Sequence, residues 1–317
     1  MSAQTLLELA KGRFGALTPA EKTLFRAVAS GEWADYTTGD EEKDKPANAK
    51  EWGDERTIAA NRIAWLCADK QARKLVTHKG IQVKGACING RFDLANIEIS
   101  FWLILLDCAL SQGINLQHAR IGGLVLTGSQ TGSINADGVK VAGSVFLRNG
   151  FKAEKEVRLL GAEIGGEVDC TNSQFSDPNG KALNADGIKV ARGVRLGNGF
   201  KAEGEVRLLG AEIGGEVDCE NGQFINPEGD ALNGQRIKVA DCVLLRTGFK
   251  VQGRINLAFA NIGHGLACNG IDSTAGMTLD VRAANVGTFR DGHNTQFVLI
   301  VVRFCRGGST KQSSWCV

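Results

Sequence analysis

Apolar and polar residues alternate in short runs through the middle of the chain, as they do in β-strands that bury one face. In one representative stretch the apolar positions are Val157, Leu159, Ala162, Ile164, Val168 and Cys170. Glycines separate these runs, which are too short to bury a core by themselves. The pattern therefore predicts short strands whose partners are supplied by other parts of the chain.

The stretch that carries this pattern returns at an interval of 49 residues. FKAEKEVRLLGAEIGGEVDC at 151–170 recurs at 200–219 with one change, in which Gly204 replaces Lys155, and a diverged copy occupies 249–268. Self-similarity at a fixed period of this size is typical of proteins built from stacked repeats. Because each unit lacks a core of its own, stacking on its neighbours must supply one.

Weaker forms of the pattern extend the array toward the N-terminus, through GINLQHARIGGLVL at 113–126 and back to about Ile81. Four strand starts fall within one unit, at positions 157, 168, 183 and 194, which indicates that a unit comprises two coils. We therefore expect a mainly β fold. In it, residues 81–291 form a right-handed β-helix, or solenoid, capped by a helical N-terminal region.

Two coils stacked at about 4.8 Å each would place residues 49 apart roughly 10 Å from one another. This spacing bears on Cys170, Cys219 and Cys268, which recur at one inward position. A shared zinc ion needs sulfur ligands at about 2.3 Å, and a disulfide needs Cα atoms within about 7 Å. We therefore expect these cysteines to be small buried apolar residues.

Charged residues recur at outward positions of the same units. Their stacking predicts mixed charge stripes, with lysines on one face, arginines on another and acidic residues beside them. The candidate ladders for binding a partner are Lys140, Lys189, Lys238, Arg158, Arg207, Glu163, Glu212, Asp169 and Asp218. A solvated face with interleaved charges is the alternative. Asn135, Asn184 and Asn233 also recur and predict a structural asparagine ladder.

The first part of the chain follows different rules and predicts a helical cap over residues 1–80. The segment TPAE at 18–21 has the signature of a capped helix start, and Gly31 marks the end of that helix. A second helix is expected over 54–76, with the polar segment 37–53 before it as a mobile surface loop. This region would cover the strand edges and apolar core that an open solenoid end exposes.

The repeat pattern fades after about position 291. The remaining segment, 292–317, contains one apolar run, FVLIVV, and a basic tail with cysteines. We expect a C-terminal edge strand there, which could pair with a second molecule to form a homodimer. Contact of this tail with a membrane surface is the alternative.

Composition narrows the classes of partner. The 317 residues carry 37 basic and 35 acidic side chains, a near balance that predicts no binding of nucleic acid. The apolar runs are far shorter than the roughly 20 residues of a membrane-spanning helix, and no secretory signal is recognisable. Nine cysteines without close pairs fit a reducing compartment. We expect a cytoplasmic protein, with peripheral membrane contact as an alternative.

The units A-x-I-x-G and V-x-L-x-x-A-x-I resemble those of bacterial pentapeptide-repeat-like β-helix proteins. GAEIGGEVDC lies at their centre and RTIAANRIAWLCADKQARKLV precedes them, so that the resemblance covers about residues 54–291. It implies a solenoid architecture. Because some members of this group are labelled membrane-associated oxidoreductase, the resemblance also raises an enzymatic alternative.

Motifs that would identify an enzyme are missing from the sequence. No G-x-G-x-x-G joins a strand to a helix, and neither a Walker loop nor a G-x-S-x-G elbow occurs. The histidines at 78, 118, 264 and 293 are scattered and do not have metal-ligand spacing. We expect no catalytic residue, metal or cofactor, and predict a non-catalytic scaffold that binds a protein partner through the solenoid faces. The alternatives are a membrane-associated oxidoreductase, a glycan-active β-helix enzyme and a peripheral membrane scaffold.

Overall fold

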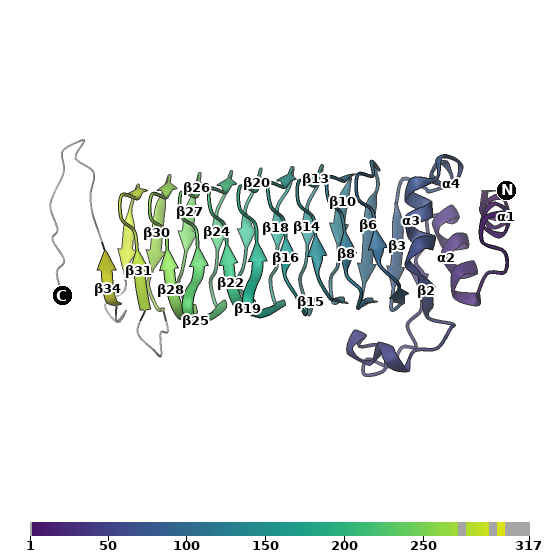
Figure 1. The fold of residues 1–317 in the computed structure, drawn as a ribbon, viewed down its shortest axis with the longest axis horizontal. Coiled ribbons are helices and arrows are strands. Elements are labelled where there is room, and N and C mark those ends of the chain that lie inside the picture. The colour runs from purple at the N-terminus through teal and green to yellow at the C-terminus, as the bar shows by residue number, and fades with distance from the viewer. Residues whose placement is uncertain (1, 272–276, 292–296, 302–317) are drawn as a thin grey trace.

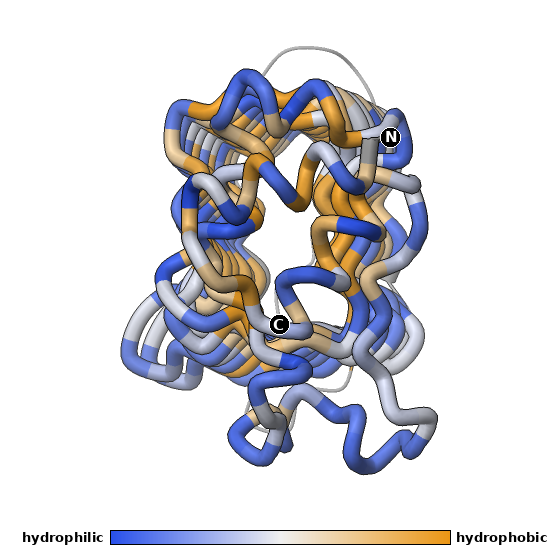
Figure 2. The backbone as a smooth tube through the Cα atoms, turned by 90° about the vertical axis from the view of Figure 1, so that its right-hand side faces the viewer, coloured by the Kyte–Doolittle hydropathy of each residue, from blue (hydrophilic) through white to orange (hydrophobic). Residues whose placement is uncertain are grey.

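The computed structural model describes residues 2–271, 277–291 and 297–301. They form a β-solenoid of about nine turns with helices at the N-terminal end, as predicted from the repeats (Figure 1). The strands of successive coils pair in parallel and stack into three sheets, which we name A, B and C. Viewed along the solenoid axis, the apolar residues gather on the inner side of the coils (Figure 2).

Two of the sheets run along most of the described solenoid. Sheet A consists of β1 (Ala34–Asp35), β3 (Ile81–Lys84), β6 (Trp102–Leu106), β10 (Gly123–Val125), β14 (Val145–Phe146), β18 (Val168–Asp169), β21 (Val194–Arg195), β24 (Val217–Asp218), β27 (Cys242–Leu244), β30 (Gly265–Cys268) and β33 (Phe289–Asp291). Sheet C consists of β9 (Arg120–Ile121), β13 (Lys140–Val141), β17 (Glu163–Ile164), β20 (Lys189–Val190), β23 (Glu212–Ile213), β26 (Lys238–Val239), β29 (Asn261–Ile262) and β32 (Asn285–Val286).

Sheet B is the largest, with 15 strands. Its main path consists of β2 (Thr57–Ala59), β4 (Cys87–Asn89), β7 (Ala109–Leu110), β11 (Gln130–Thr131), β15 (Lys152–Ala153), β19 (Gln174–Asn184), β22 (Lys201–Arg207), β25 (Gln223–Asn233), β28 (Lys250–Asn256), β31 (Met277–Asp280) and β34 (Phe297–Val301). Its branch consists of β5 (Phe92–Asp93), β8 (Ile114–Asn115), β12 (Ile134–Asn135) and β16 (Val157–Arg158). One 49-residue unit thus holds more strands than the four starts that the sequence suggested.

The coils alternate between two lengths. The inward residues Val141, Ile164, Val190, Ile213 and Val239 pair in succession along sheet C and differ by 23, 26, 23 and 26 positions. This confirms that a 49-residue unit comprises two coils. The longer coils contain an excursion in β19 and in β25, where the pairing register shifts between the two ends of each strand.

The excursion explains the single difference between the two nearly identical copies. Gly204 has a φ of +114°, and a Cβ atom at this position would lie 2.2 Å from the carbonyl oxygen of Asp177 in the excursion of the preceding coil. Only glycine combines that backbone angle with so close an approach. Position 155 follows a coil without an excursion, so a lysine side chain is tolerated there.

Five phenylalanines form a continuous stack inside the solenoid, with neighbouring ring centroids 5.1 to 5.7 Å apart. They are Phe151, Phe175, Phe200, Phe224 and Phe249, all fully buried. In successive coils the phenylalanine lies either just before the strand of sheet B or within that strand. Each ring within a strand therefore lies beside a small residue of the neighbouring strand. Phe175, for example, pairs with Ala153 in one neighbouring coil and with Ala202 in the other. Large and small side chains therefore interdigitate along the axis, as close packing requires.

The cap begins with two helices, α1 (Ser2–Phe14) and α2 (Pro19–Ser30). The predicted start and end of α2 are confirmed: Thr18 and Glu21 form a reciprocal capping box, and Gly31 ends the helix in the left-handed conformation. The sequence patterns did not indicate α1, which packs against α2.

The prediction of one helix over 54–76 is wrong. The segment contains strand β2 and two short helices, α3 (Ala60–Ala68) and α4 (Lys70–Lys74), divided where Asp69 caps the second. Strand β2 pairs with β4, and β1 likewise pairs with β3. The sheets therefore begin before Ile81, because parts of the cap region supply their first strands.

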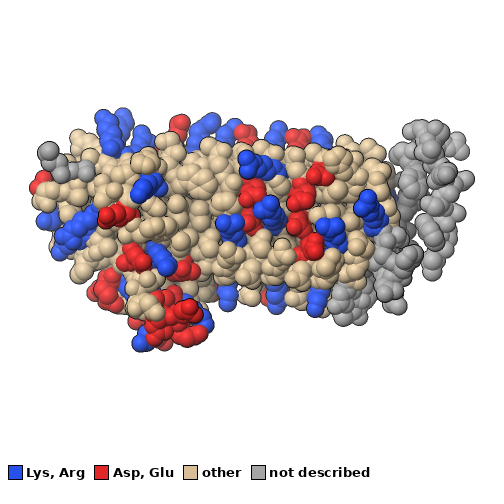
Figure 3. Space-filling model, turned by 180° about the vertical axis from the view of Figure 1, so that it is seen from behind, with Lys and Arg blue, Asp and Glu red and all other residues tan. Residues whose placement is uncertain are grey.

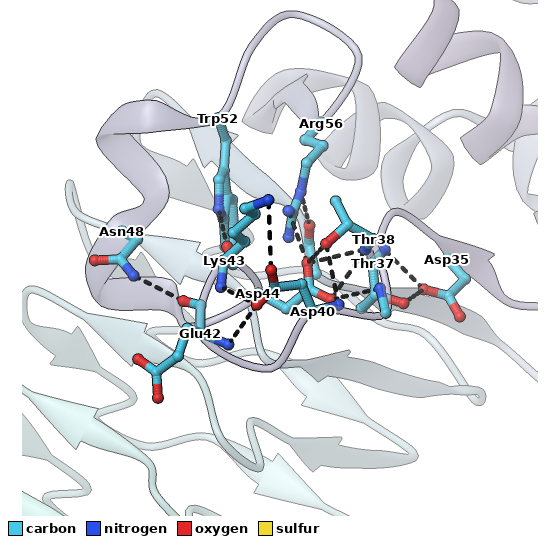
Figure 4. A network of polar contacts seen from close by, with 12 residues as sticks. Asp35, Thr37, Thr38, Asp40, Glu42, Lys43, Asp44, Asn48, Trp52 and Arg56 are labelled. Carbon is cyan, nitrogen blue, oxygen red and sulfur yellow. Dashed lines mark hydrogen bonds and ion pairs between the residues drawn. The ribbon is translucent and has the colours of Figure 1, made fainter.

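The polar segment 37–53 is held by a hydrogen-bond network (Figure 4), and its expected mobility stays a prediction. It contains a short 3₁₀ helix, η1 (Pro46–Glu51). The carboxylate of Asp44 accepts hydrogen bonds from the backbone N–H groups of Thr38 and Gly39 at 2.9 and 3.0 Å and pairs with Arg56 at 2.8 Å. The Arg56 guanidinium also stacks on Trp52 and donates to the carbonyl of Gly85, so that it ties the segment to the first coils.

The repeated cysteines Cys170, Cys219 and Cys268 form no disulfide within the described residues and are fully buried, as predicted. Burial raises the pKa of the Cys170 and Cys219 thiols far above the ordinary value. At the C-terminal end, β34 pairs in parallel with β31 and continues sheet B. Most of the predicted tail, at 292–296 and 302–317, lies outside the described residues, and the predicted dimer through this edge stays a prediction.

Candidate functional site

The candidate ladder residues lie on three separate surfaces. Five of them share sheet C: Lys140, Glu163, Lys189, Glu212 and Lys238. The two arginines lie in sheet B, and the two aspartates in sheet A. The lysines and glutamates, expected as neighbouring stripes, form one stripe. The expectation that Asp169 and Asp218 lie beside the glutamates is wrong, because the chain turns from sheet C to sheet A between Ile164 and Val168.

Sheet C is built from two alternating triplets, Lys-Val-Ala and Glu-Ile-Gly. The first residue of each triplet points outward, the second is buried, and the third begins the turn. The outward column, which we call the charge ladder, is Arg120, Lys140, Glu163, Lys189, Glu212, Lys238, Asn261 and Asn285. Like charges on adjacent strands repel one another, so alternation of sign stabilises the stacked coils.

The charges of this ladder pair with their neighbours while they remain accessible. Lys140 lies 2.7 Å from Glu163, and Glu212 is shared between Lys238 at 2.9 Å and Lys189 at 3.7 Å. Between 43% and 65% of each of these five side chains is exposed. The hydrogen bond from Lys140 lowers the pKa of the Glu163 carboxyl, and Lys238 lowers that of Glu212 in the same way. Both glutamates are therefore ionised at neutral pH, and all five side chains are accessible to a partner.

A groove follows the charge ladder along the solenoid. Its volume is about 1880 Å³, and it extends from residues 73–78 of the cap to Gly263. The third residues of the triplets form a floor of small side chains: Gly122, Ala142, Gly165, Ala191, Gly214, Ala240 and Gly263. Several of these glycines are required by the stacking itself. A Cβ on Gly165 or Gly214 would lie 2.3 Å from the carbonyl oxygen of the alanine in the preceding coil.

Beyond the floor, outside the residues that line the groove, lies a column in which long side chains interrupt a series of glycines, and we call it the rim. Backbone hydrogen bonds link Gly143, Gly166, Arg192, Gly215, Asp241 and His264 in coil order. Asp241 and His264 depart from the repeat, because the preceding unit has Arg192 and Gly215 at these positions. The His264 ring nitrogen Nδ1 lies 2.8 Å from Asp241, and this contact lowers the pKa of the Asp241 carboxyl.

The arginine surface in sheet B is engaged within the chain. Arg158 donates to Asp137 at 3.1 Å, and Arg207 donates to Asp186 at 2.8 Å. Arg158 and Arg207 also alternate with asparagines, so the column reads Asn135, Arg158, Asn184, Arg207 and Asn233. The continuous asparagine ladder that the sequence predicted is therefore wrong. Only 39% of the Arg158 side chain and 26% of the Arg207 side chain is exposed, so these arginines are weaker candidates for binding than the charge ladder.

The aspartates of sheet A also have contacts within the chain, and Asp218 accepts a hydrogen bond from the backbone N–H of Glu220 at 2.9 Å. Asp169 is nearly buried and lies 2.7 Å from Arg148. Burial opposes ionisation of Asp169, but hydrogen bonds from Thr171 and Arg148 outweigh it and lower the pKa of the carboxyl. Basic and acidic side chains also interleave on the face seen in Figure 3. The groove along sheet C is therefore the candidate functional site, with five of the nine candidate residues.

The sequence did not reveal that lysines and glutamates share one column or that a rim of glycines borders them. Comparison of residues 49 positions apart aligns Lys189 with Lys238. It does not show that Glu212, in the coil between them, lies beside both lysines. An alignment of the two triplets at alternating offsets of 23 and 26 would have placed these residues together.

Comparison of the chain with family models, with curated proteins and with solved structures gives no match. The resemblance to pentapeptide-repeat-like proteins therefore stays a prediction.

Within residues 2–271, 277–291 and 297–301, no group of three or more His, Cys, Asp or Glu side chains is placed to hold a metal ion. No helix in the same part of the chain is long and apolar enough to cross a membrane.

Proposed function

We propose that the protein is a non-catalytic binding scaffold and that the groove along sheet C receives a protein partner. One observation carries this proposal: the same cross-section, with an accessible charge beside a floor of small residues, is presented coil after coil. A long and uniform surface suits an elongated partner, because each coil offers an equivalent contact. An alternating ladder also binds most tightly a partner whose charges alternate in the same register, and this preference gives specificity.

The rest of the chain has roles that support this surface. The core of phenylalanines and alternating Ile and Val residues keeps the coils in register, and the cap lines one end of the groove. A cytoplasmic location belongs to the same proposal and is supported by the buried cysteines, which form no disulfide within the described residues. The oxidoreductase, the glycan-active enzyme and the peripheral membrane scaffold stay predictions from the sequence.

Site-specific photocrosslinking in cells tests the proposal. A photoreactive amino acid in place of Ala191, on the floor of the groove, should give covalent adducts with protein. The same amino acid in place of Asn179, exposed on the excursion of β19, is the matched control. Adducts at Ala191 that are weak or missing at Asn179 are expected. No adduct with any protein at Ala191, including another copy of the chain, would overturn the proposal.

A further inference from the structure

Over the central coils, the charge ladder and the floor of the groove repeat every second coil, and a two-fold axis can exploit that alternation. We infer that the groove binds a second copy of the same chain, face to face and antiparallel. This inference rests on the proposed function and names the partner for the same surface. The axis crosses the groove between the coil of Lys189 and the coil of Glu212, so that each column faces itself in reverse order.

The charge ladder is self-complementary under this symmetry. Lys189 faces Glu212 of the partner subunit, and Glu163 faces Lys238 of the partner subunit. The symmetry repeats both contacts, so the central four coils contribute four pairs of opposite charge and no pair of like charge. These side chains are accessible, and the lowered pKa of Glu163 and Glu212 keeps both carboxyls ionised at neutral pH.

The ends of the ladder are neutral toward each other. Lys140 faces Asn261 of the partner subunit, and Arg120 faces Asn285 of the partner subunit. The replacement of charge by asparagine in the last two coils therefore removes the repulsion or attraction that those coils would otherwise add. The attraction is concentrated on the four coils nearest the axis.

The floor of the groove is complementary in size. The triplets alternate alanine with glycine, so an axis between two coils places each alanine against a glycine. Ala191 faces Gly214 of the partner subunit, and Ala240 faces Gly165 of the partner subunit. Small residues on both sides allow the two backbones to approach closely.

The rim, which lies beyond the residues that line the groove, is compatible with the same axis. Counted by coil, Arg192 faces Gly215 of the partner subunit, Asp241 faces Gly166 of the partner subunit and His264 faces Gly143 of the partner subunit. Every long side chain of this column thus meets a glycine. Repulsion between neighbouring coils explains the alternating charge ladder within one chain, but it does not explain why residues that break the repeat face glycines.

Other registers are less favourable. An axis through the coil of Lys189 would place that lysine against its own copy and Glu163 against Glu212 of the partner subunit. An axis between the coils of Glu163 and Lys189 would place Arg120 against Lys238 of the partner subunit, at two symmetry-related contacts. Juxtaposed like charges cost several kcal/mol in an interface, so the alternation disfavours both of these registers.

The first test is the mass of the purified chain by analytical ultracentrifugation over a range of concentrations, at low and at high salt. A species of twice 33.7 kDa that dissociates as salt rises is expected. Zero-length carbodiimide crosslinking then reports the register. Lys238 and Glu163 of one chain are three coils, or roughly 14 Å, apart, so a crosslink between them must join two chains.

Charge-reversal variants supply the second test. K189E places two glutamates together at two symmetry-related contacts and should weaken the dimer by about tenfold or more. E212K should do the same. The double variant K189E/E212K restores opposite charges and should recover dimerisation, which separates loss of the interface from loss of folding. K152E is the matched control, because Lys152 is an exposed lysine of sheet B that does not line the groove, and should leave the dissociation constant within about twofold.

The outcomes separate this inference from the proposed function. A chain that is monomeric at every concentration, or a dimer that neither K189E nor E212K weakens, overturns the two-fold inference. If photocrosslinking at Ala191 still yields adducts with another protein, the proposed scaffold function stands without the dimer. If Ala191 gives no protein adduct at all, the proposed function fails as well.

Discussion

Apart from the excursion, the 23-residue and 26-residue coils follow the same path, but they fill several of its columns with different residues. Where one coil has lysine, valine and alanine in sheet C, the next has glutamate, isoleucine and glycine. Where one has its phenylalanine before the strand of sheet B, the next has it two residues later. Each coil is thus complementary to its neighbours and would clash with a copy of itself. The 49-residue period is the shortest that satisfies this rule.

Moving a phenylalanine within its coil is expected to have the largest effect. The double variant F200A/A202F keeps the composition but places the new ring directly beside Phe175 and Phe224. Loss of a buried phenylalanine alone costs about 3–5 kcal/mol, and the crowded new position adds to that cost. Urea unfolding should show the swap to be at least as destabilised as F200A. A swap as stable as the parent would mean that the coils do not need to alternate.

Exchange of the one residue that differs between the near-identical copies is expected to come next. G204K forces a side chain against the Asp177 carbonyl at a positive φ and should lower the free energy of unfolding by about 2–4 kcal/mol. K155G, the reverse change in the coil that follows no excursion, should cost about 1 kcal/mol or less.

A suppressor of G204K would sharpen the same point. Removal of residues 177–180 shortens the excursion and takes away the carbonyl that a side chain at 204 would strike. Thermal unfolding should therefore show that G204K destabilises the shortened chain much less than the full chain. Equal destabilisation in both would place the strain elsewhere.

The buried column of sheet C should respond more weakly. V190I adds one methyl group between Ile164 and Ile213, which are already the larger members of the column, and should cost about 1 kcal/mol. I213V, the matched deletion of a methyl group, should cost about 0.5–1.5 kcal/mol. If the combined variant V190I/I213V recovers most of the loss, total volume matters more than alternation at this column.

The accessible charge ladder should have the smallest effect on folding. The hydrogen bond from Lys140 lowers the pKa of Glu163 in the folded chain, so this pair stabilises the fold above the ordinary carboxyl pKa of about 4.3. The contribution is lost as the pH falls through the lowered pKa. K140M should therefore reduce the stability slightly at pH 7 and not at pH 2, as the midpoint of urea unfolding would show. An equal loss at both pH values would assign the effect to packing of the lysine stem.

Much of this architecture could be predicted from the sequence, because identical letters 49 residues apart reveal a repeat directly. The start of α2 was equally legible in Thr18 and Glu21, whose capping contacts are local. The triplets of neighbouring coils share no letter, so that comparison of identical residues could not place Lys189 beside Glu212. Strand β2 and the network around Asp44 depend on partners in other coils, Cys87 and Gly85 among them. A pattern within one segment cannot report such contacts.

The alternation of the coils also limits how a chain of this kind can change in length. Insertion of one coil would place lysine on lysine in sheet C and a phenylalanine beside its own equivalent in sheet B. Insertion of a whole 49-residue copy would preserve every lateral contact and extend the solenoid by roughly 10 Å. A chain of this kind can therefore change its length only in steps of two coils. Tandem duplication of complete 49-residue units lengthens it without any change to the packing of its core.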